Sequence, residues 1–524
     1  MSASNPTSTR RELLQITATG LAATILPSYS TANADDTLID ENAHMSQRPL
    51  HYQTLTDVAT QIAKGELSSA QVTDAQLKRI QTLEPKLHSY YTVMAEQAMQ
   101  ASAAADAAQA QGKPLGPLHG VPIAVKDLCH KKGAPTTAGH VFRKNQISEA
   151  DATVVARLEE AGAIILGKLA TTEGAMVGYH RAFEIPRNPW GDLDRWPGVS
   201  SGGSGVATAA GLCFASLGSD TGGSIRYPSA ANGIVGLKPT WGRVSRHGVL
   251  DLAPTLDHIG PMTRSIRDAA RVLNVIAGHD PHDPTSLTAP VDDYEAEMTR
   301  GVVGLRLGWD ENYATQNVEP HVASAVRNAV SQLASQGANI VEIDFPTLEE
   351  DEANAWSTLA AAEAAAVHEA TFPARQAEYG NYFRQFLESG HQTSSVALAK
   401  AIFARKRANG RVAPVFDGID CLICPTLASE SFRYQPEDAY GGFDFENGLL
   451  AGVPLDFFGR SGRFVSIWDY NGYPTLSVPC GFSPDDIPLS LQLIGSPLSE
   501  AVLCRAGYAF EQANDFHLKH PLLA

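Results

Sequence analysis

The chain has 524 residues, a formal net charge of −17 at pH 7 and 44% hydrophobic residues. So acidic a balance argues against nucleic acid as a partner, because the phosphate backbone attracts lysine and arginine. Six cysteines in a chain of this length do not form a disulfide scaffold, and the 16 histidines show no metal-ligand spacing. No dinucleotide fingerprint is visible either, so we expect no cofactor.

The N-terminus carries the parts of an export signal in order. Arg10 and Arg11 precede an apolar run over 16–26, which is too short and too mild for a membrane span. A cleavage site of the A-x-A type ends at Ala34. The arrangement resembles a twin-arginine signal over 1–34. It predicts a periplasmic or secreted bacterial protein without stable membrane anchoring; the alternative is a tail with a chance arginine pair.

Helical and extended patterns alternate along most of the chain. This alternation predicts an α/β fold with a large mixed, mostly parallel central sheet flanked by helices on both faces. We expect helices over 69–83, 94–110, 204–212, 226–231 and 322–336 and one beginning at Asp151, and strands over 121–125, 163–166, 213–217, 303–307 and 339–343. Ser69 is the expected N-cap of the first of these helices.

A lysine ends the most apolar of the early strands. Lys126 directly follows the apolar run over 121–125, so it emerges from the core and not from a solvated face. An ordinary surface lysine is protonated near neutral pH and cannot act as a base. Burial disfavours the charged form, so a buried lysine can be neutral and accept a proton.

Two turns rich in serine and glycine follow this lysine. The second turn, over 218–226, places Gly222 and Gly223 before Ser224, at the expected start of a short helix. Consecutive N–H groups in such a turn can converge on one developing negative charge. The first turn places Ser200 24 residues before Ser224. A serine between lysine and nucleophile can relay a proton, so the pattern indicates a relay from Ser224 through Ser200 to Lys126.

These blocks resemble the amidase signature family. The resemblance extends over about 55–512, and it is carried by 118–127, 187–190, 198–205, 218–231, 233–240, 260–262, 471–479 and 491–495. It departs from the family pattern at Val199, where the family usually has glycine.

The resemblance implies roles for individual residues. Ser224 is then the acyl-accepting nucleophile, Lys126 the base, and Ser200 the bridging serine that follows a cis peptide bond. Backbone N–H groups of Thr221, Gly222 and Gly223 would form the oxyanion hole, with the N–H of Ser224 as a further candidate. We further expect substrate contacts from Thr136, Met176, Phe457 and Trp468. Phe458 and Phe464 are candidates for the same apolar pocket. Ordinary core packing is the alternative for the aromatic residues, and a turn is the alternative for Thr136.

The expected organisation follows from the same resemblance. A linker over 35–54 leads to a single domain over 55–524, in which a variable, mostly helical segment over about 348–462 faces the substrate. The implied reaction is hydrolysis of a small-molecule amide, such as an acylamide, a peptide amide or a carbamate. A monomer or homodimer is expected.

Several alternatives stay open. Gly198–Gly202 fits the G-x-S-x-G nucleophile elbow of α/β-hydrolases, although the polar segment before it does not read as a strand. Asp220 and Arg226 are expected to pair with each other. Cys421 and Cys424 are expected to pack in the core, with a disulfide as the alternative. For function, the alternatives are an amidotransferase A subunit that needs a partner and a binding protein without catalysis.

Overall fold

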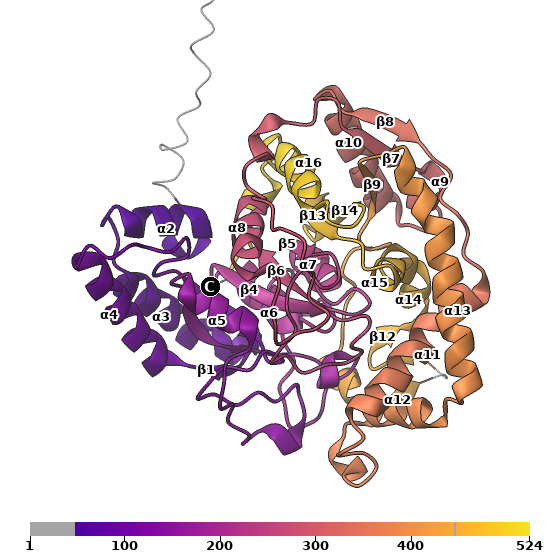
Figure 1. The fold of residues 1–524 in the computed structure, drawn as a ribbon, viewed down its shortest axis with the longest axis horizontal. Coiled ribbons are helices and arrows are strands. Elements are labelled where there is room, and N and C mark those ends of the chain that lie inside the picture. Colours follow the sequence, from indigo (N-terminus) through magenta and orange to yellow (C-terminus); the bar gives the residue numbers. More distant parts are fainter. Residues whose placement is uncertain (1–47, 445–446, 524) are drawn as a thin grey trace, which may run out of the picture. The chain divides into compact units, whose positions relative to one another are not determined.

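The computed structural model describes residues 48–444 and 447–523, and the predicted export signal lies outside the described residues. Its α-helices are α2 (Leu55–Ala63), α3 (Ser69–Leu87), α4 (Ala95–Ala110), α5 (Thr153–Glu160), α6 (Gly202–Ala209), α7 (Arg226–Asn232), α8 (Ile266–Ile276), α9 (Glu311–Thr315), α10 (Pro320–Ser335), α11 (Glu350–Val367), α12 (Asn381–Gln392), α13 (Ser395–Val412), α14 (Leu455–Ser461), α15 (Ser466–Tyr470) and α16 (Glu500–Gln512) (Figure 1).

An 11-stranded sheet forms the centre of the described chain. Its strands are β1 (Tyr90–Val93), β2 (Pro122–Lys126), β3 (Ile164–Leu169), β4 (Ala215–Asp220), β5 (Val235–Lys238), β6 (His258–Thr263), β7 (Arg306–Trp309), β8 (Asn339–Glu342), β9 (Cys421–Pro425), β13 (Thr475–Phe482) and β14 (Pro488–Ile494). A separate three-stranded sheet contains β10 (Phe443–Asp444), β11 (Leu449–Leu450) and β12 (Val453–Pro454).

The large sheet is mixed, as the sequence predicts. Its order is β1-β3-β2-β4-β6-β5-β13-β14-β9-β7-β8. Parallel pairs occur in two blocks, β3-β2-β4 and β9-β7-β8, and the strands between these blocks pair antiparallel. The parallel share is therefore smaller than the alternation of helices and strands suggests, because β13 and β14 form a hairpin that needs no crossover helix.

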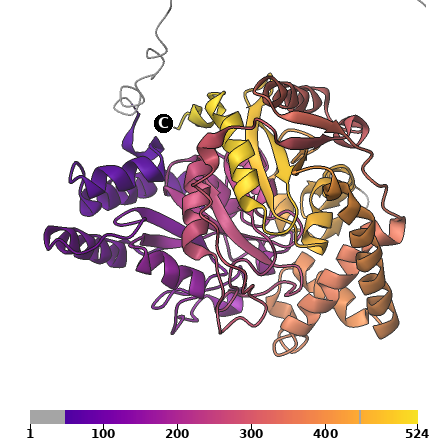
Figure 2. The same ribbon diagram turned by 45° about the horizontal axis from the view of Figure 1, so that its top comes forward.

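The hairpin brings the end of the chain into the middle of the sheet. β13 pairs with β5 and β14 pairs with β9, so segments far apart in sequence lie side by side (Figure 2). This pairing explains why the sequence blocks near Ser224 and near 471–495 belong to one structure. The described residues form one compact unit.

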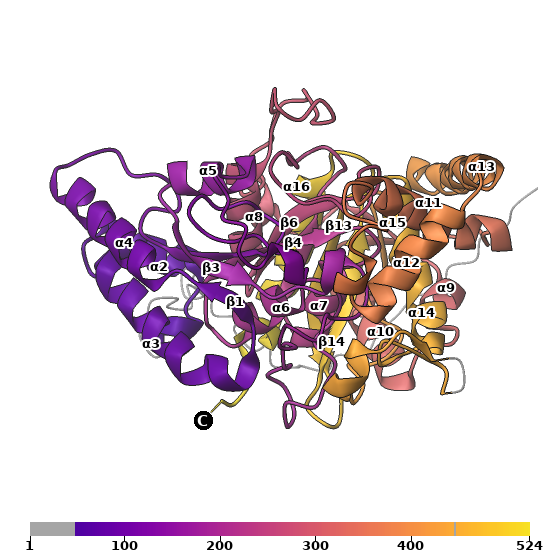
Figure 3. The same ribbon diagram turned by 90° about the horizontal axis from the view of Figure 1, so that it is seen from below.

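Helices cover both faces of the sheet. Apolar side chains of α5, α8, α10 and α16 share one hydrophobic core with the strands, and α3 and α6 pack in a second core that includes Ala124 of β2. Figure 3 shows α5, α8 and α16 on one side of the sheet and α6 and α7 on the other. The prediction of helices on both faces is confirmed.

Two local predictions differ from the structure. The N-cap of α3 is Ser68 and not Ser69. The Ser68 hydroxyl accepts from the Gln71 N–H, and the Gln71 side-chain oxygen accepts from the Ser68 N–H. The segment over 348–462 is also less uniform than expected. It contains α11, α12 and α13, but β9 within it is a buried strand of the large sheet.

The two cysteines of β9 point to opposite faces of the sheet. Cys421 belongs to the core shared with α8 and α16, whereas Cys424 packs with the core of α11 and α13. Residues three apart on a strand face opposite sides, so these thiols cannot pair. Both are free and buried. The core-packing prediction is confirmed.

Candidate active site

The alternation of β2 determines where Lys126 lies. Ile123 and Val125 face the core of α5 and α8, whereas Ala124 faces α6. Because side chains alternate along a strand, Lys126 is on the same face as Ala124. There it meets the polypeptide just before α6. Only 1% of its surface is exposed.

Three serine hydroxyls surround the Lys126 amine. The Nζ atom is 2.6 Å from Ser200 Oγ, 2.9 Å from Ser201 Oγ and 2.8 Å from Ser219 Oγ. All four residues are buried. Burial lowers the pKa of Lys126 to about 7, although the charge of Asp220 acts in the opposite direction. Near neutral pH the amine is therefore present in both protonation states.

The hydrogen-bond pattern indicates which serine hydroxyl donates to Lys126 when the amine is neutral. An ammonium group donates three bonds, which matches three accepting hydroxyls. A neutral amine has two N–H groups and one lone pair, so one hydroxyl must donate to it. Ser201 Oγ already donates to the carbonyl of Ser219, at 3.2 Å. Ser200, with the shortest contact, is the best placed to donate its proton to Lys126.

The turn that carries Ser200 is not a nucleophile elbow. That elbow requires a strand before the serine, and the residues over 191–197 contain turns and one isolated bridge at Arg195. The Val199–Ser200 peptide bond is cis, as the family resemblance implies. Ser200 is fully buried, whereas the serine of an elbow is exposed at the top of the sheet. The α/β-hydrolase alternative is excluded.

A buried carboxylate shapes the turn before Ser224. Asp220 accepts hydrogen bonds from the N–H groups of Gly223 and Ile225, and the Arg226 guanidinium donates to both of its oxygens. Burial alone would raise the pKa of Asp220, but Arg226 outweighs burial and holds the pKa well below its usual value. The predicted pairing of Asp220 with Arg226 is confirmed. It fixes the backbone from which Ser224 projects.

This carboxylate also decides which backbone donors remain free. The N–H of Gly223 is bonded to Asp220, at 2.5 Å, and so it is not free to hold an oxyanion here. The N–H groups of Thr221, Gly222 and Ser224 donate to no other described residue. The donor set expected from sequence therefore loses Gly223 and keeps Ser224.

Ser224 opens onto a cavity of about 360 Å³. Its side chain is 8% exposed, and its hydroxyl makes no hydrogen bond within the described chain. Thr221, Gly222 and Met176 line the same cavity, so Met176, an expected substrate contact, lies in the pocket onto which Ser224 opens. Most other lining residues are apolar or aromatic: Ala175, Val177, Val199, Tyr227, Leu252, Trp356, Tyr382, Leu450, Leu455 and Phe458.

Three of the predicted substrate contacts do not line this cavity. Thr136 is buried beside Lys168, whose Nζ donates to its hydroxyl at 2.8 Å. Phe457 packs against Trp196 and Tyr227 in the core, and Trp468 is fully buried. These three assignments to the pocket are therefore corrected. Thr136 is held by Lys168, and the two aromatic residues pack in the core. On α14 the residue that lines the cavity is Phe458, next to Phe457.

Sequence reasoning missed four residues of the site. Ser201 and Ser219 contact Lys126, and both stand next to residues that the motifs already single out. Asp257 accepts a hydrogen bond from the Thr221 hydroxyl, at 2.6 Å. Trp356 on α11 donates to the Thr221 carbonyl, at 2.8 Å. No signal in the sequence distinguishes Trp356, because it lies in a helix with no recognisable motif.

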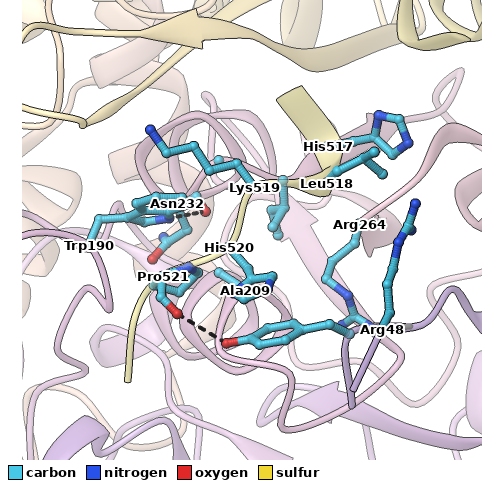
Figure 4. Close-up of a pocket in the computed structure, with 13 residues that line it drawn as sticks. Arg48, Trp190, Ala209, Asn232, Arg264, His517, Leu518, Lys519, His520 and Pro521 are labelled. Atoms are coloured by element: carbon cyan, nitrogen blue, oxygen red, sulfur yellow. Dashed lines mark hydrogen bonds between the residues drawn. The ribbon is translucent and has the colours of Figure 1, made fainter. Parts of the chain in front are cut away.

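A second hollow, drawn in Figure 4, is distinct from this site. Its lining shares no residue with the Ser224 cavity. Tyr52 Oη donates to the carbonyl of Pro521, which attaches the C-terminal segment to the start of the described chain.

Among residues 48–444 and 447–523, no cluster of three or more His, Cys, Asp or Glu is arranged to hold a metal. No helix in the same ranges is long and apolar enough to cross a bilayer.

Comparison with known proteins agrees with this geometry. The family model named Amidase matches residues 71–504. A relative named amidase AmiD, from Mycobacterium tuberculosis, is 43% identical over 473 residues, which cover 89% of this chain and 95% of the relative. The A subunit of the glutamyl-tRNA(Gln) amidotransferase of Moorella thermoacetica is 38% identical over 499 residues, with 90% and 99% of the two chains covered.

A solved structure shows the same fold. A bacterial aryl acylamidase of the amidase signature family superposes with a TM-score of 0.80 at 25% identity, covering 91% of this chain and all of the other. The chain therefore belongs to the amidase signature family. It is a hydrolase that acts on carbon–nitrogen bonds.

Proposed function

We propose that Ser224 attacks the amide carbonyl and that its proton passes through Ser200 to Lys126. The observation that carries this proposal is the short contact between Lys126 Nζ and Ser200 Oγ in a buried site, beside a turn that presents Ser224 to a cavity. A neutral lysine in such a site is a competent base.

Each step uses groups that the site supplies. Ser224 Oγ forms a bond to the carbonyl carbon while Ser200 takes its proton and gives its own to Lys126. The carbonyl oxygen becomes an oxyanion, for which the N–H groups of Thr221, Gly222 and Ser224 are the donors. Losing one such donor typically costs about 2.7–4 kcal/mol of transition-state stabilisation.

Expulsion of the amine reverses the relay. When the carbon–nitrogen bond breaks, Ser200 donates a proton to the leaving nitrogen and recovers one from the Lys126 ammonium. Proton donation is essential because an amide anion is a far poorer leaving group than an alkoxide. Water then attacks the acyl-enzyme by the same proton path, which releases the acid and restores Ser224.

The cavity favours a small, largely apolar substrate. Its volume of about 360 Å³ is near the lower end of the range of ligand sites. Aromatic and aliphatic side chains dominate its lining, and described lining residues carry no charged side chain. We infer aryl or alkyl acylamides, C-terminal peptide amides or carbamates as the substrate class.

A panel of amides tests this function. Acylanilides, aliphatic amides, peptide amides, carbamates and matching esters are given to the wild-type protein and to Ser224→Ala. Turnover that disappears in the variant supports the serine amidase mechanism, and the preferred member identifies the substrate class. Substantial hydrolysis by Ser224→Ala refutes the nucleophile assignment.

An amidotransferase A subunit is the second candidate. It is favoured by the 38% identity to the protein of Moorella thermoacetica, which acts in a tRNA-dependent reaction by its name. Such a subunit would hydrolyse glutamine and would depend on a partner. Glutaminase assays of the isolated chain, with the amide panel as reference, distinguish the two functions. Labelling of Ser224 by an acylating probe would exclude a binding protein without catalysis.

We also propose that the protein is exported as a folded enzyme through a twin-arginine route and cleaved after Ala34. Support comes from the order of the arginine pair, the short apolar run and the cleavage site in the sequence. Sequencing the N-terminus of protein isolated from the periplasm of its host tests this. A mature chain that still begins at Met1 would contradict it.

A further inference from the structure

The oxyanion turn is held from outside by a helix that the catalytic motifs do not include. Trp356, on α11, donates its indole N–H to the carbonyl oxygen of Thr221, at 2.8 Å. The same ring lies against Gly222: a Cβ atom added to Gly222 would be 2.8 Å from Trp356 Cζ2. Trp356 also lines the Ser224 cavity.

Because a peptide unit is planar, the hydrogen bond from Trp356 to the Thr221 carbonyl also affects the Gly222 N–H. In a trans peptide the C=O of one residue and the N–H of the next lie in one plane and point in opposite directions. The Thr221–Gly222 bond is not among the cis bonds of the described chain. A hydrogen bond to the Thr221 carbonyl therefore also fixes the direction of the Gly222 N–H, which donates to no other described residue.

A second anchor prevents the peptide plane from turning. The Thr221 hydroxyl donates to Asp257 Oδ1, at 2.6 Å, while Asp257 Oδ2 accepts from the N–H groups of Leu252 and Ala253. Asp257 is buried. Thr221 is thus held at two points: Asp257, directly before β6, binds its hydroxyl, and Trp356 on α11 binds its carbonyl. The Gly222 N–H of the following peptide remains available to a ligand.

We propose that Trp356 is a positioning residue that orients the Gly222 N–H as an oxyanion donor. This inference rests on the proposed function, because it needs an oxyanion to form on the carbonyl that Ser224 attacks. Preorganised donors act in the transition state and not in the ground state, so their loss lowers kcat more than it raises KM. Trp356 contributes to catalysis through Gly222 and not by a proton transfer of its own.

Trp356→Phe tests the proposal because it removes the indole N–H and keeps an aromatic ring against Gly222. We expect kcat to fall about 10- to 100-fold, which is less than the loss from complete removal of an oxyanion donor, with KM within about twofold. The pH profile should keep its wild-type apparent pKa, because Lys126 is untouched. Trp241→Phe is the matched control: the Trp241 indole N–H has no hydrogen-bond partner in the described chain, and kcat should not change.

Ligand affinity separates positioning from a general structural role. A trifluoromethyl ketone analogue of the best amide substrate forms a tetrahedral oxyanion, and the product acid does not. Trp356→Phe should weaken the analogue by the same factor as kcat/KM and leave the product affinity unchanged. Equal loss for both ligands, or a kcat no lower than that of Trp241→Phe, would overturn the inference. Labelling of Ser224 that persists in Trp356→Phe shows that the nucleophile itself is intact, so failure of the inference is distinguishable from failure of the proposed function.

Discussion

Lys126 and Ser200 are joined by a 2.6 Å contact in a part of the core that is closed to solvent. Their side chains come from β2 and from the turn before α6, 74 residues apart in sequence. Because Ser201 and Ser219 occupy the other two positions around the amine, the lysine is held in one orientation. The base is therefore both desolvated and preorganised.

This arrangement predicts the pH dependence of catalysis. The base must be neutral, and burial lowers the pKa of Lys126 to about 7. Below that pH the amine is protonated, so kcat/KM should fall about tenfold per pH unit, and above it kcat/KM should reach a plateau. Rate measurements from pH 5 to 9 check this. A flat profile over that range would contradict the role of Lys126.

Replacement of the lysine provides the complementary test. Lys126→Met removes the amine and keeps an unbranched apolar chain, so amide turnover should fall by about 10³-fold or more, as for loss of a base that serves both acylation and leaving-group protonation. An ester with a good leaving group should lose less, because its leaving alkoxide needs less help. Equal losses on amide and ester would argue against proton delivery to the leaving nitrogen.

The two carboxylates that contact Arg226 should respond differently to substitution. Asp220 is the anion that organises the turn, whereas burial and the nearby Asp220 raise the pKa of Asp469 well above its usual value. Asp220→Asn should lower the free energy of unfolding by about 3–5 kcal/mol, since it leaves a buried guanidinium without its main partner. Asp469→Asn should cost less, because burial and the neighbouring Asp220 already disfavour the charge of Asp469, and an amide keeps an oxygen that can accept from Arg226. Urea unfolding of both variants measures the two losses. Equal destabilisation would contradict the assignment of Asp220 as the main partner of Arg226.

Much of the catalytic centre could be predicted from the sequence. Lys126 follows an apolar strand, and the serine turns have recognisable spacing, so local pattern and family resemblance together locate them. Trp356 could not be found in this way, because its role arises when α11 packs on the turn before Ser224. The antiparallel middle of the sheet was also not predictable from alternation alone, since β13 and β14 insert there from the end of the chain.

Neighbouring phenylalanines on α14 provide a matched test of the cavity. Phe458 lines the cavity, whereas Phe457 is 1% exposed and packs against Trp196 and Tyr227. Phe458→Ala should change KM and substrate preference with little effect on stability. Phe457→Ala should lower the free energy of unfolding by about 3–5 kcal/mol, because it leaves a cavity in the core.

The outcome of that pair is read from two measurements on each variant. Steady-state kinetics on the preferred amides measures the effect on KM and substrate preference, and denaturant unfolding measures the effect on the free energy of unfolding. If Phe457→Ala alters substrate preference while Phe458→Ala does not, the sequence-based assignment of Phe457 to the pocket would be reinstated.

The most direct test of the account is to locate the acylated serine. The wild-type protein is treated with a fluorophosphonate, digested, and the modified residue is identified by mass spectrometry, with Ser224→Ala and Ser200→Ala in parallel. The account predicts one adduct on Ser224, none in Ser224→Ala, and a slower reaction at the same residue in Ser200→Ala. An adduct on Ser200, or labelling that persists in Ser224→Ala, would contradict it.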